Sequence, residues 1–422
     1  MSAHPDRLSR SLGLTDAVII GLCSMLGAGI FIGLGPAAAA AGTGMLLGLL
    51  LAAAVAFCNA TSSAQLAALY PESGGAYAYG RKRLGRFLGW LAGWAFLVGK
   101  IASCAAAALA FGLYVDARHA RGLALVAVAV LAAVNYRGIR TTVYAVRVAV
   151  AVVLAALVVV TAASLLGESV DIHRLAHGWT AGGFVGILRS AGFLFFAFAG
   201  YARIATLGEE VKDPERTIPR ATVLALALVL GIYAIVCAGV LVAVGPETLA
   251  SASAPLAVAV HSGRLRALSP VVTVGAATAT LSVLLSLLAA VSRTVFAMAA
   301  NRELPSALAA VHPRFKVPHR AEIAVAVLVG ALVVWTDARS AVGLSAFTVL
   351  VYYAVANASA FTLAPRERCW PRAFTIVGFL GCLLLAANLP RESLLAGTGL
   401  LAFGCVAYAC RRMHSAAITP GE

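Results

Sequence analysis

Long apolar segments recur along the whole chain, separated by short polar stretches that carry most of the Lys and Arg residues. A helix needs about 20 apolar residues to cross the roughly 30 Å hydrocarbon core of a bilayer. Twelve segments reach or approach this length, which predicts an all-α membrane protein with 12 transmembrane helices. The predicted limits are 14–41, 44–69, 87–115, 121–136, 143–166, 182–208, 219–244, 269–299, 321–337, 340–364, 373–389 and 393–410.

The composition supports a membrane protein and excludes an ordinary soluble enzyme. Of the 422 residues, 61% are hydrophobic and 12% charged, whereas soluble domains are about half apolar and about a quarter charged. The chain contains no H-E-x-x-H, G-x-S-x-G or P-loop motif, and its eight cysteines form no C-x-x-C pair. We therefore expect a single membrane domain over residues 1–422, with no enzyme activity, no cofactor and no metal site.

The positive charge predicts how the chain is oriented in the membrane. The net charge is +15, but the basic residues lie between apolar segments, so the expected partner is the lipid bilayer and not nucleic acid. With the N-terminus in the cytoplasm, the inner segments hold 21 Lys and Arg residues and the outer segments hold 7. Because Lys and Arg favour the cytoplasmic side, we expect a multi-pass protein of the cytoplasmic membrane with both termini cytoplasmic.

The first apolar segment contains helix-breaking residues near its middle. Gly27, Gly29, Gly33 and Gly35 fall within nine positions and are followed by Pro36, a pattern that weakens helical hydrogen bonding. A broken helix inside a membrane exposes backbone groups that must be buried in protein or line a cavity, and transporters use such groups to hold charged substrates. Close helix packing through the Gly29-x-x-x-Gly33 pattern is the alternative interpretation.

A second interruption is predicted in the sixth segment. There an aromatic cluster ends at Gly200, and polar residues follow immediately. The two interruptions lie five segments apart, which is the spacing expected of an inverted five-plus-five repeat with two discontinuous helices facing each other at the membrane midplane.

Five stretches resemble the motifs of the amino acid, polyamine and organocation (APC) permease superfamily, of the bacterial amino acid permease type. They cover the chain from about residue 10 to its end. The matching stretches are GAGIF at 27–31, PESGGAY at 71–77, FFAFAGY at 195–201, EEVKDPERTIP at 209–219 and SRTVFAMA at 292–299, the last followed by Leu304 and Pro305.

This resemblance implies a leucine-transporter-type fold with discontinuous helices 1 and 6. Repeat one would span about 14–166 and repeat two about 182–364, with two additional helices at about 373–410. It also implies a secondary active transporter that moves amino acids by alternating access, either coupled to protons or by exchange. A transporter-like amino acid sensor or partner-binding membrane protein without net flux is the alternative. The oligomeric state stays open.

The resemblance also implies a substrate site at the two interruptions. Backbone N–H groups in the first helix would bind the α-carboxylate of an amino acid, because such groups carry partial positive charge. Carbonyl groups in the sixth helix would bind the α-ammonium, and one or more aromatic rings would cover it. The implied residues are Ser24, Gly27, Ala28, Gly29, Ile30, Phe195, Phe198, Ala199, Gly200 and Tyr201.

The sequence favours a neutral substrate. Relatives that carry cations often have an acid just after the glycine-aromatic pair of the sixth helix, where this chain has Ala202, and the predicted limits place no Asp or Glu at mid-membrane depth. A cationic substrate without a counter-charge would cost several kcal/mol in an apolar site, so neutral and acidic amino acids stay open.

Lys100 lies about midway along the third segment, where an ionised side chain is costly. It can exchange a proton during transport, supply a fixed positive charge where relatives bind sodium, or attract an acidic substrate group. A structural lysine paired with carbonyl groups is the fourth interpretation. Some sodium-independent relatives carry an amine in the fifth helix, but the matching position here is Val152 or Val153.

Further charged residues are expected at the inner end of the bundle. Arg203, Glu209 and Arg293 are predicted to act in coupling or gating, with Glu209 and Glu210 as partners of Arg293. Asp16 is expected to cap the first helix or form a gate ion pair. Ser282, Ser286 and Ser292 either line a cavity facing the first helix or hydrogen-bond to their own helix.

Overall fold

Helices make up almost all of the regular structure in the computed structural model. The structure describes residues 12–70, 74–138, 142–167, 170–179, 181–205, 207 and 210–418. No β-strand occurs in these residues, and an isolated parallel bridge joins Leu12 to Val211. The all-α fold predicted from the apolar segments is therefore confirmed for the described chain.

Most of the α-helices lie within the predicted apolar segments, and two short helices, over 76–83 and 255–261, lie between them. They are α1 (Leu14–Met25), α2 (Ala28–Ile32), α3 (Leu34–Ala41), α4 (Met45–Leu69), α5 (Ala76–Arg83), α6 (Arg86–Val115), α7 (Ala120–Tyr136), α8 (Val143–Leu165), α9 (Gly183–Phe198), α10 (Ala202–Ala205), α11 (Pro214–Ser251), α12 (Pro255–His261), α13 (Ser269–Ala300), α14 (His319–Trp335), α15 (Ala338–Phe361), α16 (Arg372–Ala387) and α17 (Arg391–Ile418).

Nine helical stretches of the described chain are long and apolar enough to cross a membrane. Two further apolar helices, α7 and α16, have 17 and 16 residues, and α14 also has 17. The protein is thus a helical membrane protein with several spanning helices.

One helix departs from its predicted limits for a clear local reason. Helix α11 begins at Pro214 and continues to Ser251, past the predicted end at 244. Gly245 adopts a left-handed φ of 77° and Pro246 follows it, so the helix kinks and then resumes. The apolar pattern ends before this last turn, which explains the difference.

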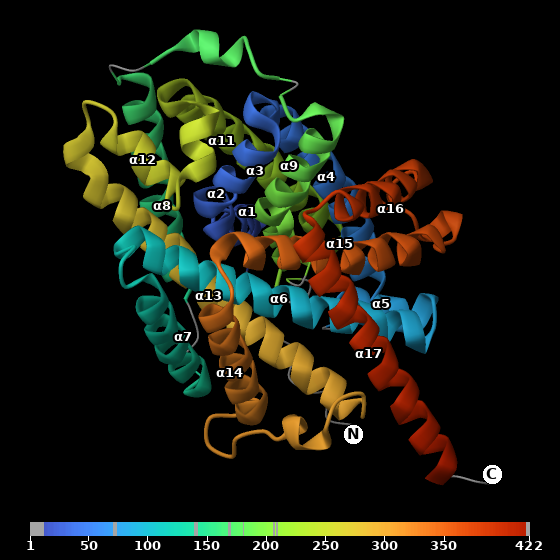
Figure 1. Ribbon diagram of the computed structural model, residues 1–422. Helices are drawn as coiled ribbons and strands as arrows, with labels where there is room; N and C mark the ends of the chain where they lie inside the picture. Colours follow the sequence, from blue (N-terminus) through green and yellow to red (C-terminus); the bar gives the residue numbers. More distant parts are fainter. Residues whose placement is uncertain are drawn as a thin grey trace.

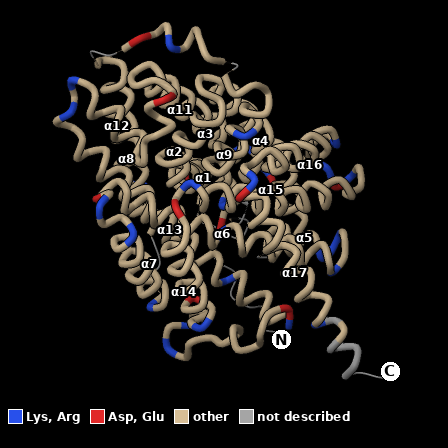
Figure 2. Tube along the Cα trace, viewed as in Figure 1, with Lys and Arg blue, Asp and Glu red and all other residues tan. Residues whose placement is uncertain are grey.

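Figure 1 shows how the ends of the bundle are formed. The segment between α8 and α9 crosses the upper end, whereas the loop after α13 and the last turns of α17 lie at the lower end. In Figure 2 the Lys and Arg positions concentrate in loops and near helix ends, and most of the bundle carries no charge. This distribution agrees with an apolar middle layer between two charged ends.

Small residues bring the central helices close together. Ala105, Ala106, Ala107 and Ala108 of α6 are fully buried. A Cβ atom added at Gly99 would lie 2.5 Å from Thr348 Oγ1 of α15, so only glycine fits there. Such packing of small side chains is a main source of stability for helices in a membrane.

Candidate functional site

The first membrane helix is broken at Leu26 and Gly27. Helix α1 ends at Met25 and α2 begins at Ala28. Leu26 has ψ of 52° and Gly27 has φ of −112° with ψ of −151°, so both leave the helical region. Because Gly27 has no side chain to cap α2, the first N–H groups of that helix lack a side-chain partner. The expected interruption at the glycine-rich stretch is present.

The sixth membrane helix tightens where an interruption was expected. Helix α9 ends at Phe198, a 3₁₀ turn η3 covers Ala199–Tyr201, and α10 follows. Phe198, Ala199 and Ala202 all keep right-handed helical dihedral angles. The α-helix is therefore discontinuous at the expected residues, but it changes its type and does not unwind.

The two altered regions lie directly against each other. A Cβ atom added at Gly29 would lie 2.3 Å from Ala197 Cα, and one at Gly200 would lie 2.1 Å from the Ser24 carbonyl oxygen. Both contacts involve backbone atoms, so neither neighbour can move aside cheaply. In this arrangement the glycines allow the first and sixth helices to touch along their backbones.

Two buried tyrosines supply hydrogen bonds to this contact. The Tyr233 hydroxyl of α11 donates to the Met25 carbonyl at the end of α1 and lies 3.2 Å from the Ala197 carbonyl. The Tyr353 hydroxyl of α15 donates to the Ala199 carbonyl at 3.4 Å. Carbonyl groups released by the helix breaks therefore have partners inside the protein, as a membrane requires.

The aromatic residues of the sixth helix surround the contact and do not enter it. Phe195 and Tyr201 pack against Tyr353, with ring centroids 5.9 and 5.2 Å apart, and Phe198 packs against Tyr233 at 5.3 Å. The face of α9 that meets the first helix carries the small residue Ala197, and Gly200 follows in η3. In the closed contact, the rings thus hold α9 against α11 and α15.

The other expected site residues in the first helix are also buried, or their side chains are hydrogen-bonded within the protein. Ala28 and Ile30 are buried in the core. The Ser24 hydroxyl donates to the Ile20 carbonyl one turn earlier at 2.9 Å, so its proton is used within α1. Ser24 meets the sixth helix through its backbone carbonyl.

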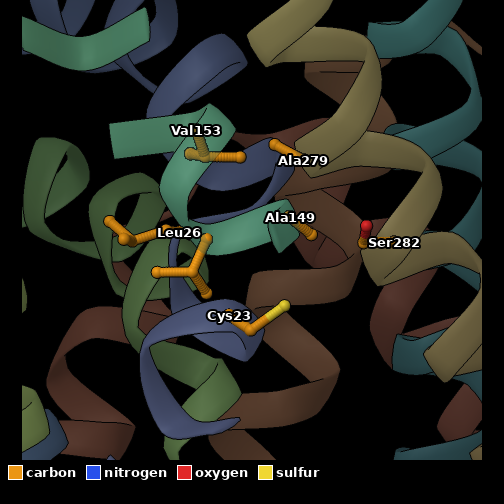
Figure 3. A pocket seen from close by; sticks show the side chains of 7 residues that line it. Cys23, Leu26, Ala149, Val153, Ala279 and Ser282 are labelled. Atoms are coloured by element: carbon orange, nitrogen blue, oxygen red, sulfur yellow. The ribbon is translucent and has the colours of Figure 1, made fainter. Parts of the chain in front are cut away.

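A narrow crevice, too small to hold a water molecule, lies beside the break in the first helix. Figure 3 shows that its walls come from three elements: the end of the first helix, α8 and α13. The lining residues are Cys23, Leu26, Ala149, Val150, Val153, Ala279 and Ser282. Ser282 therefore lines a hollow that faces the first helix, whereas Ser292 donates to its own helix at Leu288. Val153 gives this hollow an apolar wall.

Lys100 is buried at the middle of α6, with 8% of its surface exposed. Its ammonium nitrogen lies 6.0 Å from the centre of the Phe96 ring one turn away. No carboxylate in the described part of the chain forms an ion pair with it. A buried cation without a counter-charge is costly and by default indicates a function.

Of the charged residues predicted at the inner end, Arg203 and Arg293 lie near each other. Arg203 of α10 is within electrostatic reach of Glu210 and of Arg293 on α13. The side chains of Arg203 and Arg293 are both exposed. Glu209 lies outside the described residues.

Several contacts hold the N-terminal end of α1 to its neighbours. Asp16 in the first turn of α1 accepts a hydrogen bond from the Gly13 N–H and forms an ion pair of 2.6 Å with Arg147 of α8. Next to it, Leu12 pairs through its backbone with Glu210 and Lys212 in the segment before α11. Gly13 is thus the N-cap residue of α1, and Asp16 supports it from the third helical position while it forms an ion pair with Arg147.

A second group of contacts joins α5 to the end of α13. The Tyr77 hydroxyl donates to Glu303 at 2.6 Å and accepts from Arg81, and Arg81 also pairs with Glu303 at 2.7 Å. Burial, reinforced by the hydrogen bond to Glu303, raises the pKa of Tyr77 to about 12. Tyr77 therefore keeps its proton at neutral pH and remains a donor in this network.

We expect Asp16→Asn to loosen the inner end of α1. The substitution removes an ion pair and weakens a cap, together worth about 1 kcal/mol, which corresponds to roughly fivefold more frequent opening. Because Cys23 lines the adjacent crevice, its rate of modification by a maleimide should rise by about that factor in a Cys369→Ser, Cys405→Ser, Cys410→Ser background. Asp213→Asn is the matched control, since its 3.9 Å pair is exposed. Equal rates in both variants would contradict this expectation.

The sequence did not identify three buried polar residues that the structure brings forward. Tyr233 of α11 donates a hydrogen bond to the Met25 carbonyl at the break in the first helix. Tyr353 of α15 donates one to the Ala199 carbonyl in the sixth helix. Glu322, at the edge of a predicted apolar segment, is 4% exposed. Tyr233 is a single tyrosine in a long apolar segment, and this was the available sequence signal. Nothing in the segment indicates which backbone group its hydroxyl contacts.

Comparisons with known proteins agree with the family suggested by the motifs. The sequence profile of the family described as "Amino acid permease" matches residues 16–365. An uncharacterized transporter of Mycobacterium tuberculosis is 55% identical over 97% of this chain and 93% of its own length. The branched-chain amino acid permease BcaP of Bacillus subtilis is 25% identical over 90% of this chain and 88% of its own length.

A relative with a different named substrate is also similar. The vacuolar cationic amino acid transporter 2 of Arabidopsis thaliana is 30% identical over 84% of this chain, which covers 60% of the relative. The profile match covers most of the chain, including both altered helices. The chain therefore belongs to the amino acid permease family, and it is a membrane transporter of the APC superfamily.

Proposed function

We propose that this protein is a secondary active transporter that moves neutral amino acids across the cytoplasmic membrane by alternating access. The observation that carries the proposal is the contact between the broken first helix and the 3₁₀ turn of the sixth helix. Separation of these two helices would expose N–H groups of Ala28 and Gly29 opposite carbonyl groups of Ala197 and Ala199. Together these groups suit the two charged ends of an amino acid.

The finer fold proposed here is a leucine-transporter-type bundle of twelve membrane helices. Repeat one covers about 14–166, repeat two covers about 182–364, and two additional helices cover about 373–410. The altered helices are the first of each repeat, which supports this division. We further propose that both termini are cytoplasmic, because most Lys and Arg residues lie in the segments on that side.

The proposed substrate site comprises the residues implied by the motifs, with a specific division of roles. Gly27, Ala28, Gly29 and Ile30 would bind the carboxylate through their backbone, with Ser24 beside them. Ala199, Gly200 and the neighbouring carbonyl groups would bind the ammonium. Phe195, Phe198 and Tyr201 would shape the space for the side chain once the two helices separate, because their rings already surround the contact.

A neutral substrate is favoured by the charges around this site. Position 202, just after the 3₁₀ turn, is alanine, and the buried charge at the middle of α6 is the cation Lys100. A cationic side chain would therefore meet repulsion without compensation. The named substrate of the Bacillus subtilis relative, a branched-chain amino acid, is consistent with this choice.

Counterflow in proteoliposomes tests the proposed function. Purified protein is first screened by thermal shift against the twenty amino acids, since a ligand that binds the folded state raises its stability. Vesicles loaded with the unlabelled amino acid that gives the largest shift should then take up the labelled form transiently. A thermal shift without counterflow would instead support a sensor, and no shift with any amino acid would contradict the proposal.

Substitutions of Lys100 should change the pH profile or the substrate range. Lys100→Met removes the charge at similar side-chain length. A buried charge contributes well over about 1.4 kcal/mol, and about 1.4 kcal/mol corresponds to about a tenfold change in transport rate. Lys100→Arg retains a charge that cannot titrate. If Lys100 exchanges a proton, both variants lose the pH dependence of uptake, whereas a fixed charge would leave Lys100→Arg active. Unchanged profiles in both variants would exclude Lys100 from the mechanism.

A further inference from the structure

A second buried ionisable residue lies away from the two altered helices. Glu322 is in the first turns of α14, a helix that packs mainly against α6, α7 and α13. Only 4% of its surface is exposed. Its Oε1 atom accepts no hydrogen bond from any described residue. An ionised carboxylate in such a position costs several kcal/mol unless donors surround it.

The polar neighbours of Glu322 supply few free donors, because only the second N–H of the Asn135 amide is not engaged elsewhere. Its carboxyl group faces Ser292 of α13 and Asn135 of α7. The Ser292 hydroxyl donates its only proton to the Leu288 carbonyl at 2.7 Å, and the Asn135 amide donates to the Leu285 carbonyl at 3.1 Å. Both side chains retain oxygen lone pairs that can accept a hydrogen bond. This surrounding suits a protonated carboxylic acid, which can donate its own O–H group.

Charged and titratable groups face Glu322 from each of the packed helices. Arg293 of α13, whose side chain is exposed, is within electrostatic reach. Cys104 of α6 lies on the other side, and Lys100 shares its helix face one turn away. On α14 itself, His319 lies one turn earlier, with its ring against Tyr136 of α7 and His312. Glu322 thus lies within electrostatic reach of Arg293 and Cys104, and Lys100 is one helical turn from Cys104.

We propose that Glu322 is the binding site of the coupling proton, an assignment that rests on the proposed transport function. In the closed arrangement seen here, the carboxylate takes up one proton and becomes a neutral acid. When the inner ends of α13 and α14 move apart, water and the Arg293 guanidinium stabilise the carboxylate, and the proton leaves to the cytoplasm. No bond other than O–H forms or breaks.

A metal cation fits this place less well than a proton does. The carboxyl group, the Ser292 oxygen and the Asn135 oxygen are too few to surround a hard cation, which takes about six or more oxygen ligands. No group of three or more His, Cys, Asp or Glu residues in the described chain forms a metal site. The positive charge of Arg293 also opposes a second cation.

Glu322→Gln tests the proposal because glutamine keeps the shape of the side chain and cannot titrate. In sodium-free proteoliposomes with labelled leucine, a pH difference of one unit supports at most about a tenfold substrate gradient per proton. We expect the wild-type protein and Glu215→Gln to accumulate leucine, whereas Glu322→Gln should reach no gradient and still perform counterflow. Glu215 is a suitable control because it is exposed in the first turn of α11.

The outcomes separate this proposal from the proposed function. If no protein performs counterflow with any amino acid, the transport function is wrong. If wild-type protein performs counterflow but accumulates leucine only with sodium, or if Glu322→Gln accumulates it normally, Glu322 is not the proton site. Infrared titration of the purified protein tests the protonation of Glu322 without substrate. At neutral pH, the C=O band of a protonated carboxyl group should be present in the wild-type protein and in Glu215→Gln. The same band in Glu322→Gln would overturn the assignment.

Discussion

Gly29→Val is expected to abolish uptake by this transporter. Even the first carbon of a side chain at residue 29 would lie 2.3 Å from Ala197 Cα and 3.0 Å from Ala197 N. Overpacking in an adaptable core costs about 1–3 kcal/mol, and the obstacle here is backbone, so the upper end applies. That cost corresponds to roughly a hundredfold loss. The valine would also cover the N–H groups proposed to bind the substrate carboxylate.

The measurement is uptake and thermal-shift binding of the amino acid identified by the screen, with Gly231→Val as the matched control. Gly231 is also within a membrane helix, but an added Cβ atom there meets no atom within 4 Å. The control should therefore fold and transport normally. Full uptake by Gly29→Val would refute the proposed site, because it would mean that neither the close contact nor the N–H groups are needed.

Tyr233→Phe is expected to have the second largest effect. Its hydroxyl is the side-chain donor to the Met25 carbonyl at the break of the first helix, where the Gly27 N–H also donates, and it lies 3.2 Å from the Ala197 carbonyl. Loss of a donor to a buried acceptor costs about 1–3 kcal/mol, and no water replaces it within a membrane. We expect a lower Tm in detergent and weaker substrate binding, because the broken helix end loses its support.

Tyr144→Phe is the matched control for this substitution. Tyr144 is 76% exposed on α8, so loss of its hydroxyl should leave the Tm unchanged. If the two variants had the same Tm and the same uptake, the hydrogen bonds of Tyr233 would have no role in holding the first and sixth helices. Retained Tm with lost uptake would instead assign Tyr233 to the substrate itself.

The sequence predicted the helices well because a membrane imposes a simple rule. Any helix that crosses the lipid must be apolar for most of its length, so limits such as 87–115 agree with α6 at Arg86–Val115. The glycines at residues 27 and 29 likewise predicted the break, since glycine and its neighbours determine local dihedral angles. These features depend on residues close in sequence.

The candidate site was less predictable because it depends on contacts between distant residues. Gly200 was expected to interrupt the sixth helix, but its flanking residues stay helical and the glycine instead accommodates the Ser24 carbonyl. No local pattern distinguishes a glycine that breaks a helix from one that permits close packing. Tyr233 and Glu322 are each single polar residues in apolar surroundings, and their partners lie on other helices.

The 3₁₀ turn at Ala199–Tyr201 gives the sixth helix a means of rotation. A 3₁₀ residue turns the chain by about 120° and advances it about 2.0 Å, compared with about 100° and 1.5 Å in an α-helix. Conversion of these three residues to α-helix would therefore swivel the inner half by about 60° and draw it about 1.5 Å closer to the outer half. Arg203 would then rotate around the helix axis while Phe195 stays fixed. A change of winding in one turn is therefore enough to reorient the inner mouth of the proposed transport path.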